Sequence, residues 1–160
     1  MLKHLALITA ALALAPAALA ASSTTGGYGG LALAGLVAEH EPGLGPHRRH
    51  VMNALLNGSN AFSFPAGQKI SVRTGKIVCR ASNVAISQRS CELTFGARVE
   101  TLKGRRANEL FATMIEAGVP GDAGAGSVFE SLAHLDCSID PNEVKANAGG
   151  GASCTYEAGP

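Results

Sequence analysis

The stretch from His40 to His50, HEPGLGPHRRH, gathers side chains that can bind a metal ion. His47 and His50 lie three residues apart, so on a helix both would face the same point. His40, together with Glu39 or Glu41, would reach that point from the end of a preceding helix. Neutral imidazoles and a carboxylate are ligands that suit zinc or copper.

Two features of the same stretch argue against a metal ion. The start of a helix carries partial positive charge, which disfavours a cation, and Arg48 and Arg49 add further positive charge. The Pro-Gly pair is already explained by a turn between two helices. We therefore predict a helix connection without a structural metal. A metal site at His40, His47 and His50 is the alternative.

The four cysteines are Cys79, Cys91, Cys137 and Cys154, and none of them forms a C-x-x-C pair. An even number of cysteines in an exported chain predicts two disulfides. A hairpin turn centred near Ala85 would place Cys79 opposite Cys91, and the same argument places Cys137 opposite Cys154. We predict this local pairing. A cross-pairing would require the two halves of the chain to merge into one sheet.

Charge is distributed unevenly along the chain. Residues 67–106 carry nine lysines and arginines against two glutamates, whereas residues 107–160 carry one lysine against eight acidic residues. In the predicted strands the apolar residues alternate with basic ones, so one face of the sheet is expected to be positive. Arginine binds carboxylates and phosphates with defined geometry. The alternative is a solvated face that the acidic C-terminal half partly balances.

The residues that we predict to bind a partner lie in this basic segment. They are Lys69, Arg73, Lys76, Arg80 and Arg98.

Sequence motifs for catalysis are lacking: there is no G-x-S-x-G, no H-E-x-x-H and no phosphate-binding loop. The chain has no tryptophan and two tyrosines, which leaves few rings for stacking on sugars or nucleobases. We predict a protein that is not an enzyme and that binds neither a cofactor nor nucleic acid.

The first 20 residues, MLKHLALITAALALAPAALA, have the pattern of a secretory signal peptide. A short positive start precedes an apolar run, and Ala18-Leu19-Ala20 resembles a cleavage site. The run is too short to span a membrane comfortably, and no second run is long enough. We expect residues 1–20 to be removed and the mature protein to be periplasmic or secreted. Residues 21–30, rich in Gly, Ser and Thr, are expected to be a flexible leader.

Hydrophobic periodicity predicts two groups of elements. In the first, residues 31–40 and 46–57 form helices, and AFSF, KISVRT, KIVCRA, SCELTF and ARVETL form strands of an antiparallel meander. In the second, residues 107–118 form a helix and a capping box at Ser127–Glu130 begins another. His134 is then expected to be a satisfied structural residue on that helix. LDCSI and ASCTYE follow as strands, with a single helical turn starting at Asp140 between them.

These elements predict an α+β fold in which helical pairs pack on antiparallel strands, with two disulfides. The first unit covers residues 31–102 and the second covers residues 103–160, either as one compact domain or as two fused subdomains. The repeated order of helices and strands indicates a degenerate tandem α-α-β-β duplication, unless the two helical pairs are alike by coincidence.

The function expected from these features is that of an exported, non-enzymatic binding protein. Its basic sheet face would bind an acidic protein or an anionic component of the cell envelope, and an inhibitor or toxin-neutralising role would fit a small cross-linked domain. The alternatives are a periplasmic metal-binding protein and a protein with a structural role in the envelope. The sequence does not predict the oligomeric state.

Overall fold

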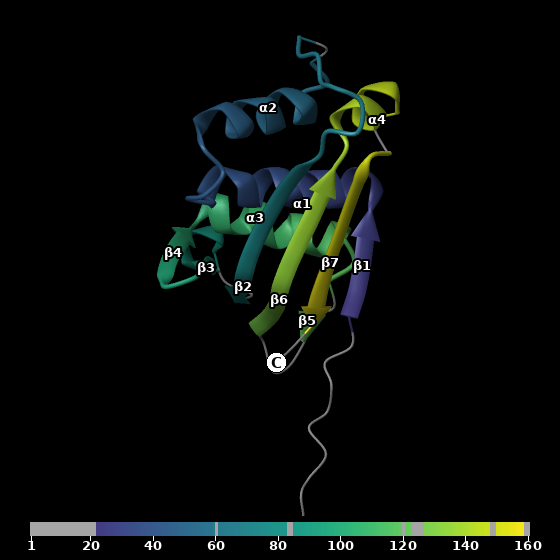
Figure 1. Ribbon diagram of the computed structural model, residues 1–160. Helices are drawn as coiled ribbons and strands as arrows, with labels where there is room; N and C mark the ends of the chain where they lie inside the picture. Colours follow the sequence, from purple (N-terminus) through teal and green to yellow (C-terminus); the bar gives the residue numbers. More distant parts are fainter. Residues whose placement is uncertain are drawn as a thin grey trace, which may run out of the picture.

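Antiparallel strands form one continuous sheet in the computed structural model, which describes residues 22–59, 61–82, 85–119, 121–122, 127–147 and 150–158 (Figure 1). The predicted signal peptide lies outside the described residues. The strand order is β1-β7-β6-β2-β3-β4, and the short strand β5 also pairs with β6. In this order the strands span Ser22–Gly26, Ala152–Ala158, Ser127–Ile139, Ile70–Ser82, Ser90–Phe95 and Arg98–Lys103, and β5 spans Gly121–Asp122.

Helices α1 (Gly27–His40) and α3 (Arg105–Glu116) lie against the same face of this sheet (Figure 1). Helix α2 (Pro46–Leu56) packs on α1 and contacts the short helix α4 (Pro141–Ala146), and a 3₁₀ turn, η1 (Ile86–Gln88), precedes β3. The predicted α+β fold with two disulfides is confirmed. No helix in the described part of the chain is long and apolar enough to cross a membrane.

Helix α1 is the centre of the hydrophobic core. It contacts strands of the sheet, α2 and α3, so its buried residues point in almost every direction. A helix that is apolar nearly all round is stable only in such surroundings. Small residues allow the close approach: an added Cβ at Gly29 would lie 3.3 Å from the backbone of Ala117 at the end of α3.

Both predicted disulfides are present, Cys79–Cys91 and Cys137–Cys154. In each pair the two cysteines are direct register partners, of β2 with β3 and of β6 with β7. Their side chains are buried on the helix side of the sheet. The local pairing is therefore confirmed.

Each disulfide lies beneath a helix from the other half of the chain. The Cys79 Sγ is 3.6 Å from the Met114 Sδ, and the Cys91 Sγ is 3.3 Å from the carbonyl oxygen of Ala107, both on α3. The Cys154 Sγ is 3.4 Å from the carbonyl oxygen of Gly30 on α1. The two halves are thus held together by reciprocal packing as well as by pairing between β2 and β6.

The C-terminal end of α3 is attached to β7 through Tyr156. Its hydroxyl donates to the carbonyl oxygen of Gly118 at 3.3 Å, just beyond the helix. Burial raises the pKa of this hydroxyl above its usual value, so at neutral pH the group keeps the proton that it donates.

Several predicted elements differ from the structure. The expected helix after Ser127 is wrong, because this segment is part of the long strand β6, whose pairing with β2 overrides a local helix signal. The expected second α-α pair is therefore absent from the described part of the chain. The expected leader, residues 21–30, is also wrong: Ser22–Gly26 pairs with β7 along its whole length, and α1 begins at Gly27.

Two further differences concern the predicted meander. KISVRT and KIVCRA are not separate strands, because β2 runs through Gly75 without turning back. AFSF forms no strand: Phe62 packs edge-on against the rings of His47 and His50 on α2, and the carbonyl oxygen of Phe64 accepts a hydrogen bond from the Asn142 side chain. The Asp140 cap was predicted correctly, since its carboxylate accepts from the backbone N–H groups of Asn142 and Glu143.

Replacing both members of either cysteine pair with alanine should lower the free energy of unfolding by ~3 kcal/mol in the chain-entropy model, because each bridge closes a loop of similar length. Urea unfolding measures this change, and peptide mapping without reductant checks the pairing. An unchanged unfolding midpoint in both double variants would contradict the prediction.

Substitution at Gly35 should depend on Leu56. A Cβ at Gly35 would lie 2.1 Å from the Leu56 Cδ1, so Gly35→Ala forces the leucine to move and should cost roughly 1–3 kcal/mol. In a Leu56→Ala background the clash disappears, and alanine should then stabilise α1 by up to ~1 kcal/mol. Thermal unfolding of the four proteins tests the reversal. An equal cost of Gly35→Ala in both backgrounds would show that the leucine is not the cause.

Candidate partner-binding site

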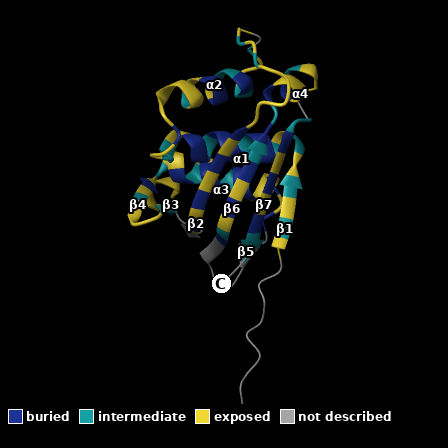
Figure 2. Cartoon of the chain, viewed as in Figure 1, coloured by how far each residue is buried: buried dark blue, intermediate teal, exposed yellow. Residues whose placement is uncertain are grey.

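No helix among the described residues covers the face of the sheet opposite α1 and α3, and exposed residues alternate with buried ones along its strands (Figure 2). On β2, Ile70, Val72 and Ile77 are buried on the helix side. Arg73, Lys76 and Arg80 are exposed. These six residues therefore lie as the alternation predicts, whereas Val78 on the same strand is also buried.

The positive charge of β2 is partly balanced by its neighbours. The Arg73 Nε lies 3.0 Å from an Asp136 carboxylate oxygen on β6, and the Arg80 Nη1 lies 3.3 Å from a Glu92 carboxylate oxygen on β3. The acidic and basic halves of the sequence are thus interleaved by the strand order. Such exposed ion pairs contribute ~0–1 kcal/mol each to stability, and the arginine side chains remain 67% and 55% exposed.

The five predicted partner-binding residues do not form a single cluster. Arg73, Lys76 and Arg80 share β2, whereas Lys69 precedes the strand and lines a separate cavity of about 350 Å³ beside Ser138 and Ser153. Arg98 lies on β4 and its Nη2 is 3.4 Å from a carboxylate oxygen of Glu100. The structure therefore brings together only the three residues of β2.

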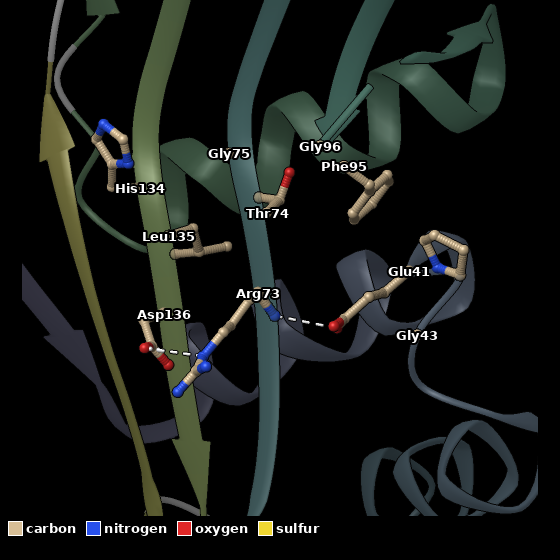
Figure 3. Close-up of a pocket in the computed structure, with 11 residues that line it drawn as sticks. Glu41, Gly43, Arg73, Thr74, Gly75, Phe95, Gly96, His134, Leu135 and Asp136 are labelled. Carbon is tan, nitrogen blue, oxygen red and sulfur yellow. Dashed lines mark hydrogen bonds and ion pairs between the residues drawn. The ribbon is translucent and has the colours of Figure 1, made fainter. Parts of the chain in front are cut away.

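A groove of about 590 Å³ opens beside the middle of β2 (Figure 3). The loop after α1, the turn between β3 and β4, and the middle of β6 complete its walls. Arg73 reaches across β6 to Asp136, while Glu41 approaches β2 from the opposite side (Figure 3). Phe95 and Leu135 add apolar surface.

The groove exists because the pairing of β2 with β3 stops at Lys76. Beyond that point the Thr74 hydroxyl donates to the carbonyl oxygen of Thr94 at 2.8 Å. The backbone N–H of Arg73 donates to a carboxylate oxygen of Glu41 at 3.0 Å. A hydroxyl and a carboxylate thus make the hydrogen bonds that a longer β3 would make.

Sequence reasoning missed this groove. The sequence suggests Glu41 only as a metal ligand, and nothing in the local pattern shows that β3 ends before β2 does. His134, which also lines the groove, was expected to be a structural residue on a helix. It lies instead on β6 at a φ of 51°, with its side chain 73% exposed and its Nε2 3.9 Å from Glu157.

The three histidines of the opening stretch do not converge on one point. The stretch connects α1 to α2, as predicted, and α2 begins at Pro46. The His40 Nδ1 lies 2.6 Å from a Glu100 carboxylate oxygen, whereas the His47 and His50 rings pack against Phe62 with centroids 6.5 and 5.5 Å away. Within the described part of the chain no three His, Cys, Asp or Glu side chains are grouped for a metal.

The His40–Glu100 pair should contribute more to stability than the nearby Arg98–Glu100 pair, because the His40 side chain is 10% exposed and that of Arg98 is 59% exposed. Glu100→Ala leaves a nearly buried imidazole without this partner, so it should lower the free energy of unfolding by about 1–2 kcal/mol. Arg98→Ala should change it by less than ~0.5 kcal/mol. Urea unfolding at neutral pH measures both. Equal effects would contradict this ranking.

Comparison of the chain with protein-family models, with curated proteins and with solved structures returns no match. The function is therefore inferred from the geometry of the open face and its groove.

Proposed function

We propose that this protein is an exported, non-enzymatic binding protein that holds an acidic partner on the open face of its sheet. The observation that carries the proposal is the row of exposed Arg73, Lys76 and Arg80 on β2, on the face that α1 and α3 do not cover. The partner is an acidic protein or an anionic component of the cell envelope, and an inhibitory or toxin-neutralising role fits this arrangement.

The strand that carries these residues is firmly supported. β6 pairs with β2 along its length, and the Cys79–Cys91 disulfide joins β2 to β3 next to Arg80. A rigid support reduces the conformational entropy lost when a partner binds. Basic side chains on such a strand are therefore held in place before the partner arrives.

The ion pair with Asp136 orients Arg73 and leaves its side chain 67% exposed. A guanidinium has five N–H donors, and Asp136 contacts Arg73 through Nε. A carboxylate or phosphate of a partner can therefore bind the exposed side of the same guanidinium, where planar two-point contacts are favoured. Electrostatic attraction of this kind governs specificity and association rate more than affinity.

Export is part of the proposal because two observations favour it. The first 20 residues have the signal-peptide pattern, and both disulfides are of the kind that persists in oxidising compartments. A periplasmic or secreted protein would satisfy both. The same disulfides would stabilise a small domain outside the cytoplasm.

The test is capture of a partner from envelope extract by the immobilised mature protein. Reversing Arg73 and Arg80 to glutamate should weaken capture about tenfold, equivalent to ~1.4 kcal/mol. Raising the salt to about 1 M should weaken wild-type capture as well, because the screening length falls to ~3 Å. The double variant Arg105→Glu and Arg106→Glu, with both residues exposed on α3 and away from the open face, is the control of equal charge change.

Circular dichroism and thermal unfolding check that the double variant keeps its fold, since all four side chains of the two ion pairs are exposed. Capture that survives both the reversal and high salt would rule out the basic face as the binding surface.

A further inference from the structure

One edge of β2 lacks a neighbouring strand over part of its length. β6 pairs with β2 from Ile70 to Ser82, but β3 pairs only with residues 76–80 before its chain turns at Gly96. On the β3 side, residues 71–75 therefore have no pairing strand within the described part of the chain, and Arg73, Thr74 and Gly75 line the groove. An unpaired stretch of strand offers a template for another extended chain.

The contact with Glu41 shows how this edge of β2 can bind a hydrogen-bond acceptor. Its carboxylate accepts from the backbone N–H of Arg73 at 3.0 Å, as the carbonyl oxygen of a neighbouring strand would. Backbone groups of alternate residues point to the same edge of an antiparallel strand, so the N–H and carbonyl of Ser71 point to the same edge of β2 as those of Arg73. Ser71 and Arg73 are thus two successive positions at which another strand could pair with β2. At Arg73 the Glu41 side chain already accepts the hydrogen bond from the backbone N–H.

The walls of the groove define the chemistry of the chain that fits it. Towards the open face lie Arg73 and its ion-pair partner Asp136, and the guanidinium of Arg73, which remains 67% exposed, suits an acidic side chain. Towards the helix side lie Phe95, Leu135 and Pro42, which suit an apolar one. Since successive side chains of a strand point to opposite faces, the complementary segment alternates acidic and apolar residues. The groove volume, about 590 Å³, is typical of ligand pockets.

We propose that residues 71–75 of β2 accept an extended segment of the partner by strand addition. The segment displaces the Glu41 carboxylate from the Arg73 N–H, places an acidic side chain against Arg73, and places an apolar side chain against Phe95. Main-chain hydrogen bonds then supply affinity and the alternating side chains supply specificity. This inference deepens the proposed function and rests on it, because it assigns the partner's mode of binding to the same face.

The first test uses a capped hexapeptide of alternating valine and glutamate as the probe, with ¹⁵N-labelled mature protein. Titration should shift the amide signals of residues 71–75, and hydrogen exchange at the Ser71 amide should slow at least tenfold at saturation. A peptide of alternating valine and lysine should bind at least tenfold more weakly. Shifts confined to β7 or β4, or no shift at millimolar peptide, would overturn the proposal.

Matched variants separate strand addition from side-chain contacts. Ser71→Pro removes an N–H on the groove edge without touching the β6 ladder, so it should weaken peptide binding at least tenfold, whereas Ser71→Ala should change it less than twofold. Equal affinities of the two variants would overturn the proposal.

Glu41 provides a second pair that does not alter β2. Glu41→Ala and Glu41→Gln both remove the negative charge, but only glutamine keeps an acceptor for the Arg73 N–H. The alanine variant should therefore bind the peptide severalfold more tightly than the glutamine variant. If Ser71→Pro does not fold, this pair decides the question, and equal affinities would count against strand addition.

Two outcomes separate this inference from the proposed function. If Ser71→Pro captures the partner from envelope extract as the wild type does, while the Arg73 and Arg80 reversal does not, strand addition is wrong and the proposed function stands. If the wild type sediments as a dimer that the peptide dissociates, the edge serves a second copy of this chain, which overturns the assignment to a partner segment.

Discussion

The pairing between β2 and β6 is the interaction on which the rest of the structure depends. It joins two hairpins, each closed by its own disulfide, into one sheet. Without it the chain would be two small units, each with too little apolar surface to fold well alone. Because the two strands are antiparallel neighbours at the centre, the outer strands β3, β4, β7 and β1 are arranged on either side of them.

The helical layer follows from the same pairing. Once β2 and β6 are adjacent, α1 from the first half of the chain lies over the Cys137–Cys154 hairpin of the second half. In the same way, α3 from the second half lies over the Cys79–Cys91 hairpin of the first half. This exchange makes the core a single cluster. Glycines and alanines along α1 let it contact the sheet, α2 and α3 at once.

The chemistry of the open face is also a consequence of strand order. β6, from the acidic half, lies beside basic β2, so Asp136 meets Arg73 and the face carries mixed charge with a basic row rather than uniform positive charge. β3 is shorter than β2, and the difference in length leaves the groove and the edge that Glu41 occupies. The proposed function and its binding mode therefore depend on two properties of the sheet, its order and its unequal strands.

Features that depend on neighbours in the chain can be predicted from the amino-acid sequence. Alternation around Cys79 and Cys91 predicted the hairpin and its disulfide, Pro46 predicted the start of α2, and Asp140 predicted the cap of α4. Tertiary structure decided the rest. The segment after Ser127 has a helix-like pattern but becomes β6, because pairing with β2 satisfies more backbone groups and buries more apolar surface than a short isolated helix can. The Ser- and Thr-rich segment at residues 22–26 becomes a strand only because β7 pairs with it. Strand order, the mixed charge of the open face and the groove beside β2 follow from contacts between residues far apart in the chain, which local periodicity does not record.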